Sequence, residues 1–129
     1  MVKASAPGKC ILFGEHAVVY GQPALACSIS QRMTIELKEE KTFDTWRLDG
    51  RTFNPKKHPH IDYLRKQLPP IEEHPIHIRI RGSIPKASGL GSSAALSVAL
   101  CGALQHLRGA DLNPLQASEL SHRAEANAQ

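Results

Sequence analysis

The pattern of apolar and polar positions predicts strands over the first part of the chain. Residues 2–40 alternate short apolar stretches with proline and glycine, which favours several short strands joined by tight turns. Residues 33–39 and 76–81 alternate apolar with polar side chains one by one. That spacing is typical of a strand with one face in the core and the other in water. We therefore expect two half-buried strands at these positions.

The middle of the chain carries weaker signals. We expect residues 42–48 to pair back onto the preceding strand, with Asp49 and Gly50 leading out of that hairpin. Residues 54–75 are polar and hold five of the nine prolines and three of the seven histidines. Within them only residues 61–66 suggest a short helix. We interpret this stretch as a surface insertion or linker.

The last part of the chain predicts two helices. Residues 93–107 are rich in alanine and apolar on almost every face, as expected of a buried helix. Gly109 ends that helix. Asn113 and Pro114 then supply an N-cap and a first-turn proline for a last helix, which runs past residue 124.

Composition and charge exclude several classes of protein. A chain of 129 residues is one domain or a piece of one. The net charge of +4 suits an anionic small molecule, and six aromatic residues without an aromatic and basic stripe argue against nucleic acid. Cys10, Cys27 and Cys101 fit neither a disulfide framework nor a metal or redox pair, which favours a reducing cytoplasm. We expect no signal peptide, no membrane span and a soluble protein.

A loop of small residues lies between the strand at 76–81 and the helix from 93. Small residues let main-chain N–H groups approach a ligand closely, and a helix N-terminus carries a partial positive charge. Phosphates are the ligands that suit such a loop, and a hydroxyl there can also bind Mg²⁺. The loop is made of Pro85, Lys86, Ala87, Ser88, Gly89, Leu90, Gly91, Ser92, Ser93, Ala94 and Ala95.

Three other interpretations apply to this loop. A tight strand-to-helix turn with a serine N-cap explains its composition equally well. A P-loop needs a lysine after its second glycine, and none follows Gly89 or Gly91. A dinucleotide loop tolerates the residues at 89–94, and Asp111 stands at the right distance. However, Asp111 leads into a helix rather than ending a second strand, which disfavours that reading.

Two segments together resemble a known family. Residues 6–21, followed by 23–26, resemble the first motif of the GHMP-family small-molecule kinases, in the form found in members that act on mevalonate. Residues 85–95 resemble the second motif, the phosphate loop. The resemblance covers essentially the whole chain, although a variable insertion at about 41–75 contributes little. It implies an α+β fold of two layers: a largely antiparallel sheet from the first 85 residues, with the two C-terminal helices on one face.

The resemblance also implies a reaction and its residues. Such kinases transfer the γ-phosphoryl of ATP to an alcohol with Mg²⁺ on the phosphates, here turning mevalonate into 5-phosphomevalonate for isoprenoid precursors. Ser93 is the expected Mg²⁺ ligand. Glu125 is the second, because the family places this glutamate four residues before a polar residue and glycine, and Glu119 is the fallback. Lys9 would lie near the reacting hydroxyl and the γ-phosphate. The residues expected near the acceptor or nucleotide are Glu15, His16 and Tyr20, with His16 contacting mevalonate.

Four histidines gather in the middle of the chain, at positions 58, 60, 74 and 77. Their spacings match no usual zinc pattern, and two of them are next to prolines. We interpret them as part of a solvated loop rather than as a metal site.

The resemblance further implies that this chain is the N-terminal, ATP-binding part of a longer enzyme. Family members have a second domain, and their catalytic aspartate would follow shortly after Gln129. We therefore expect a fragment with little activity of its own, and a homodimer as one assembly of the complete enzyme. The alternatives are another member of the family, above all one acting on phosphomevalonate, or a non-catalytic ligand-binding module of the same fold.

Overall fold

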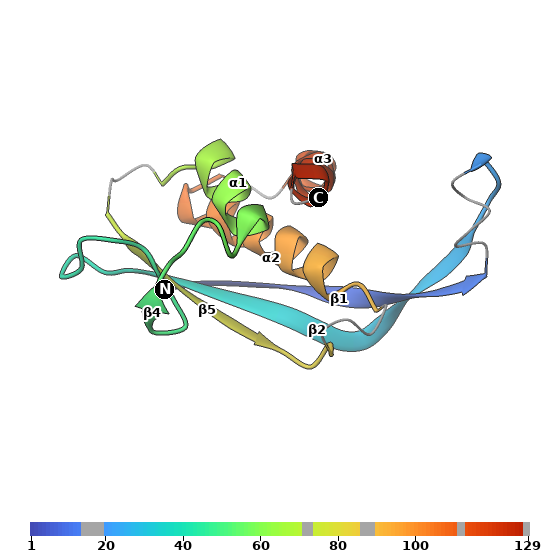
Figure 1. Cartoon of the computed structure of the whole chain (residues 1–129), viewed down its shortest axis with the longest axis horizontal. Helices are drawn as coiled ribbons and strands as arrows, with labels where there is room; N and C mark the ends of the chain where they lie inside the picture. Colours follow the sequence, from blue (N-terminus) through green and yellow to red (C-terminus); the bar gives the residue numbers. More distant parts are fainter. Residues whose placement is uncertain (14–19, 71–73, 86–89, 111–112, 128–129) are drawn as a thin grey trace.

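A five-stranded sheet with helices on one face makes up the body of the molecule (Figure 1). The computed structural model describes residues 1–13, 20–70, 74–85, 90–110 and 113–127. The strands lie in the order β1-β2-β5-β3-β4. The elements are β1 (Val2–Phe13), β2 (Leu25–Glu39), β3 (Arg47–Leu48), β4 (Arg51–Thr52), α1 (Pro59–Gln67), β5 (Ile76–Gly82), α2 (Ser92–Leu107) and α3 (Pro114–Asn127). The predicted α+β fold is therefore confirmed.

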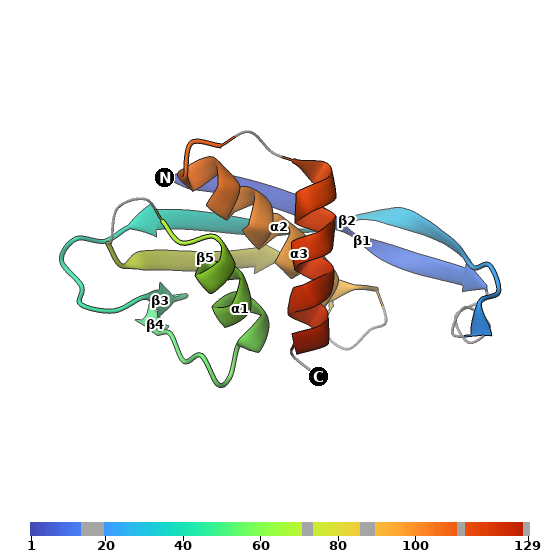
Figure 2. The ribbon, with the colours of Figure 1, turned by 90° about the horizontal axis from the view of Figure 1, so that it is seen from above.

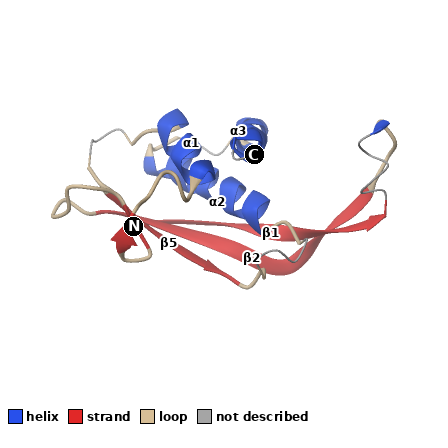
Figure 3. Ribbon diagram, viewed as in Figure 1, coloured by secondary structure: helices blue, strands red, loops and turns tan. Residues whose placement is uncertain are grey.

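The sheet is largely antiparallel (Figure 3). Strand β2 pairs antiparallel with β1 on one side and with β5 on the other. On the inner face, Ile35 and Leu37 of β2 lie opposite Ile80 and Ile78 of β5. On the outer face, Lys3 Nζ lies 3.5 Å from Glu36 Oε1, and Glu36 is the register partner of Arg79. The alternation of apolar and polar residues in these strands thus separates a core face from a charged one.

Strand β3 does not pair with β2, so the predicted hairpin at 42–48 is wrong. Both edges of β2 are already occupied by β1 and β5, and β3 instead lies parallel to β5, with Arg47 opposite His77. Asp49 and Gly50 form the turn between β3 and β4, with φ of 48° and 83°. Positive φ at both positions is what a two-residue hairpin turn requires.

The first strands are longer than the sequence predicted. Pro7 and Gly8 do not form a turn, because β1 continues through them with a shift of register between Pro7 and Lys9. A bulge of this kind absorbs the proline without ending the strand. The C-terminal end of β1 and the N-terminal end of β2 project beyond the helices (Figures 1 and 2). The large apolar side chains exposed on the projecting part include Ile11, Leu12, Tyr20 and Leu25.

The helices form the second layer of the molecule. Helix α2 lies nearest the sheet and packs on β1 and β2, while α1 and α3 lie against α2 (Figure 1). Leu100 and Leu104 of α2 are fully buried in the same cluster as Ile35 and Leu37. The predictions for both C-terminal helices are confirmed. Asn113 Oδ1 accepts a 3.1 Å hydrogen bond from the main-chain N–H of Gln116, which is the expected N-cap contact at the start of α3.

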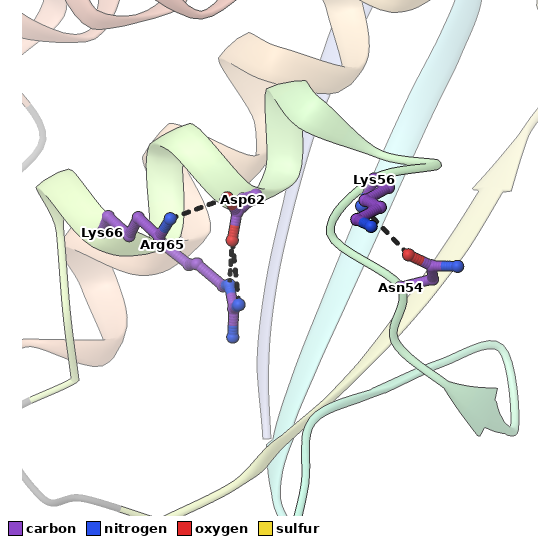
Figure 4. Close-up of polar contacts among 5 residues, drawn as sticks. All are labelled: Asn54, Lys56, Asp62, Arg65 and Lys66. Carbon is purple, nitrogen blue, oxygen red and sulfur yellow. Dashed lines mark hydrogen bonds and ion pairs between the residues drawn. The ribbon is translucent and has the colours of Figure 1, made fainter.

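Helix α1 is part of the core rather than a surface linker. Ile61 and Leu64 are fully buried, although polar residues and prolines surround them in the sequence. On another face of α1, the carboxylate of Asp62 lies 2.8 Å from Arg65 and 3.0 Å from Lys66 (Figure 4). Burial acts to raise the pKa of Asp62, but hydrogen bonds and charge from Lys66 and Arg65 more than offset it, so the pKa lies below its usual value. These contacts stabilise the helix from within.

None of the helices among the described residues is both long and apolar enough to cross a membrane.

Candidate functional site

The two predicted motifs meet where β1 passes the start of α2. The main-chain N–H of Lys9 donates a 2.8 Å hydrogen bond to the carbonyl oxygen of Leu90. Gly8 allows this close approach, because a Cβ at that position would lie 2.6 Å from the same oxygen. The Lys9 side chain then runs beside Gly91, where its Cγ lies 3.0 Å from the position that a Cβ on Gly91 would take. A lysine from the first motif thus lies beside the N-terminus of α2, the helix that begins within the second motif.

Helix α2 begins without a side-chain cap. Gly91 is its N-cap residue, in the left-handed conformation at φ 74°, and no side chain of the described residues forms a cap hydrogen bond there. The alternative of a serine N-cap is therefore wrong. The first N–H groups of a helix point outward at its start, so an uncapped start can receive an anion. The glycine readily adopts the positive φ that the chain takes at this entry into the helix.

Ser93 and Glu125 lie side by side, although they come from different helices. Ser93 Oγ of α2 donates a 3.3 Å hydrogen bond to Glu125 Oε2 of α3. The other carboxylate oxygen, Oε1, is buried and has no hydrogen-bond partner. His60 of α1 lies beside it, with Nε2 3.4 Å from Oε1. A hydroxyl, a carboxylate and an imidazole from three helices thus meet in one place.

This donor set fits a hard cation such as Mg²⁺. Hydroxyl and carboxylate oxygens are suitable Mg²⁺ ligands, and Mg²⁺ in nucleotide sites usually takes only one or two protein ligands besides phosphates and water. The buried Oε1 of Glu125 lacks a hydrogen bond, which leaves the carboxylate able to accept more. Glu119, the fallback ligand, is exposed and forms an ion pair with Arg123. No group of three or more His, Cys, Asp or Glu side chains suited to a metal occurs among the described residues.

Several predicted site residues lie outside the described part of the chain. These are Glu15, His16 and residues 86–89 of the glycine loop, together with Asp111 of the dinucleotide alternative. Tyr20 is described and is 83% exposed. Of the predicted residues, the structure therefore places Lys9 at the start of α2 and Ser93 of the same helix beside Glu125, while the acceptor side stays a prediction.

The histidines do not form the solvated loop that the sequence suggested. His60 belongs to α1, and His77 belongs to β5, where its Nε2 accepts a 2.9 Å hydrogen bond from the main-chain N–H of Gly50. Both side chains are largely buried, at 23% and 12% exposure. His60 was missed as a site residue. A signal was present, because His60 stands four residues before the buried Leu64 and so shares its face of the helix.

The chain belongs to the GHMP kinases. Residues 57–129, more than half of its length, match the family model described as the GHMP kinases N terminal domain. This agrees with the two motifs that predicted the family. Among its relatives are proteins named mevalonate kinase: it is 41% identical to the one from Methanothermobacter thermautotrophicus, over 98% of this chain and 43% of that protein. The mevalonate kinase of Pyrococcus furiosus is 34% identical, over 96% of this chain and 44% of its own length.

Solved structures share the fold. The crystal structure of the Methanococcus jannaschii mevalonate kinase aligns with a TM-score of 0.83 at 27% identity, over 98% of this chain and 46% of that one. A phosphomevalonate kinase from Streptococcus pneumoniae aligns with a TM-score of 0.73 at 22% identity, over 96% of this chain and 42% of that one, which shows a common fold alone. The chain spans less than half the length of the curated relatives it matches.

Proposed function

We propose that the complete protein transfers the γ-phosphoryl group of ATP to the hydroxyl of mevalonate, forming 5-phosphomevalonate for isoprenoid precursors. One observation carries the proposal: Ser93 and Glu125 come from separate helices and meet at 3.3 Å beside the uncapped start of α2. The relatives named mevalonate kinase, at 41% and 34% identity, support this acceptor. In this proposal the chain is the ATP-binding, N-terminal part of the enzyme.

Each residue has a defined task in the proposed reaction. The N–H groups at the start of α2 and the loop before it bind the phosphates of ATP. Ser93 and Glu125 would hold Mg²⁺, which neutralises charge on the phosphate oxygens when bound. The ammonium group of Lys9 stabilises the negative charge on the transferred phosphoryl group and on the attacking oxygen. Its stem lies beside Gly91, the N-cap residue of the same helix.

The acceptor side of the proposal depends on the family resemblance. Glu15 and His16 would bind mevalonate, with His16 in direct contact. The proton of the attacking hydroxyl would pass to the family's catalytic aspartate, which we expect after Gln129. Because that group belongs to the remainder of the enzyme, we expect this chain alone to bind nucleotide far better than it turns substrate over.

The choice of acceptor can be measured directly. The complete protein should release ADP from ATP with mevalonate present, and much more slowly with phosphomevalonate or galactose. EDTA should stop the reaction and excess Mg²⁺ should restore it. Faster turnover with phosphomevalonate would identify the runner-up function. Nucleotide binding without turnover of any acceptor would instead support a non-catalytic module.

Two further parts of the proposal concern the setting of the enzyme. A reducing cytoplasm suits the three cysteines, all of which are free thiols. A homodimer is inferred from the family resemblance alone. Light scattering on the complete protein tests the dimer, and a monomer at micromolar concentration would contradict it.

A further inference from the structure

We propose that His60 is a positioning residue that holds the Glu125 carboxylate in the orientation needed to bind a metal ion beside Ser93. This inference rests on the proposed function, because it assigns His60 a role toward the same metal ligand. It adds a residue from α1, which lies outside the two sequence motifs but within the part of the chain that matches the family model.

The Glu125 carboxylate lies between side chains of two other helices. Its Oε2 accepts a hydrogen bond from Ser93 Oγ at 3.3 Å, and its Oε1 lies 3.4 Å from His60 Nε2. A carboxylate oxygen that is buried without a hydrogen bond costs considerable free energy, and Oε1 is such an atom. His60 Nε2 lies close enough to reach Oε1, although the two atoms do not form a hydrogen bond in this geometry. An imidazole N–H turned toward this oxygen would relieve the cost.

His60 stands on a helix whose position does not depend on it. The neighbouring residues Ile61 and Leu64 are fully buried and anchor α1 in the core. On another face, the Arg65 guanidinium is paired with Asp62 and lies 4.8 Å from the centre of the Phe53 ring (Figure 4 shows the pair with Asp62). Helices α1 and α3 lie next to each other over α2 (Figure 2). The imidazole therefore approaches Glu125 from α1, a helix that other contacts hold in place.

This arrangement resembles the general construction of protein metal sites. Ligands that bind a metal are usually held by hydrogen bonds from other residues, and loss of such a partner typically weakens metal affinity about 10-fold to 100-fold. Among the described residues, no contact joins His60 to the start of α2, where we propose that nucleotide binds. Any effect of His60 on metal affinity should therefore pass through Glu125. The metal-dependent part of nucleotide affinity should change, while the metal-free part should not.

The test measures metal binding rather than turnover. Mn²⁺ is titrated into the complete protein with ADP present, and free Mn²⁺ is followed by electron paramagnetic resonance. His60→Leu should raise the Kd for Mn²⁺ about 10-fold or more. His60→Gln, which keeps an N–H near the position of Nε2, should restore affinity to within about 3-fold of the parent. The Kd for ADP without metal should stay unchanged in both variants.

The matched control is His122→Leu, which makes the same change at an exposed histidine of α3. It should leave the Kd for Mn²⁺ unchanged. Equal losses in His60→Leu and His60→Gln, or an equal loss of metal-free ADP binding, would show a general structural role and overturn the inference.

Two outcomes separate this inference from the proposed function. If Glu125→Gln weakens Mn²⁺ binding and His60→Leu does not, the proposed role of His60 is refuted, while the proposed metal site is supported. If neither Ser93→Ala nor Glu125→Gln weakens Mn²⁺ binding, the metal site itself falls, and the inference falls with it.

A second measurement leaves His60 intact, so it holds even if the leucine variant folds poorly. With histidine labelled by ¹⁵N, Glu125→Gln should shift the imidazole resonances of His60. The resonances of His77, which contacts Gly50 in the sheet, should not move. An unchanged His60 spectrum would overturn the inference.

Discussion

The main-chain N–H of Lys9 and the carbonyl oxygen of Leu90 form a 2.8 Å hydrogen bond that joins strand β1 to the foot of α2. This bond ties the first motif to the second and directs the Lys9 side chain along Gly91. The cation and the helix start are therefore held together by the main chain. Their relative position does not depend on a flexible side-chain contact.

Replacing the Lys9 side chain should separate its charge from this structural role. Lys9→Met keeps an unbranched apolar stem beside Gly91 and leaves the main-chain bond intact, but removes the ammonium group. In the complete protein, kcat with ATP and mevalonate should fall about 100-fold to 1,000-fold, because a group that stabilises developing charge is lost. Lys3→Met, at an exposed lysine of the same strand, is the control and should change kcat less than about twofold. A loss below tenfold for Lys9→Met would contradict the catalytic role.

Gly8 should not tolerate even a methyl group. A Cβ there would lie 2.6 Å from the Leu90 carbonyl oxygen and 2.9 Å from Ile84 Cδ1, so the main chain must move. Gly8→Ala should lower the free energy of unfolding by about 2 kcal/mol, a typical cost of overpacking, as measured by urea denaturation. Gly109→Asn is the comparison: open space surrounds that position, and asparagine tolerates its φ of 72°. Equal stability of Gly8→Ala and the parent would show that the main chain at Leu90 can move away from the added methyl group at little cost.

Cys10 and Cys27 should form a disulfide under mild oxidation. They are register partners on β1 and β2 and both are free thiols, a relationship that their distance in the sequence conceals. Directly opposed Cα atoms in antiparallel strands are about 4.5–5.5 Å apart, within the range that a disulfide spans. Diamide should therefore join the two sulfurs, with both thiol hydrogens passing to the reagent.

Peptide mapping by mass spectrometry checks this cross-link. Cys10→Ser should abolish it, and the buried Cys101 should remain unmodified in the parent protein. A product that links either strand cysteine to Cys101, or one that links two molecules, would contradict the register.

The buried thiol of Cys101 should make the free energy of unfolding fall as the pH rises into the alkaline range. Burial raises the pKa of its thiol from 9.0 to about 11. The folded state then holds this proton more tightly than the unfolded state, so the stabilisation is complete below pH 9 and is lost between pH 9 and 11. The free energy of unfolding should fall by about 1 kcal/mol more in the parent than in Cys101→Ala between pH 9 and 10. Urea denaturation at several pH values checks this, and parallel pH curves would refute it.

Residues that act through local pattern were predicted well. The alternation at β5 and the apolar character of α2 follow from nearest neighbours in the sequence, and both elements form as expected. The family resemblance also singled out Lys9, Ser93 and Glu125; the fold places Lys9 beside Gly91 and Ser93 beside Glu125, while their roles stay predictions. The position of β3 could not be predicted, because a strand of two residues pairs according to which sheet edge is free.

The burial of α1 and the position of His60 likewise depend on contacts between distant parts of the sequence. The prolines and charged residues around α1 resemble a linker in composition, while its burial depends on Ile61 and Leu64, which contact elements distant in sequence. His60 gains its importance only when α3 brings Glu125 beside it. The spacing within α1 indicates the face on which His60 lies, but not the residue of another helix that it meets.

The charged outer face of the sheet, with Lys3, Glu36 and Arg79 in adjacent strands, lies on the side opposite the helices. Side chains on that face point away from Ser93 and Glu125, which belong to the helical layer. A fluorophore or a surface linker attached through Lys3 would leave the proposed nucleotide site turned toward the solution. The molecule can thus be immobilised for binding measurements by the back of its sheet.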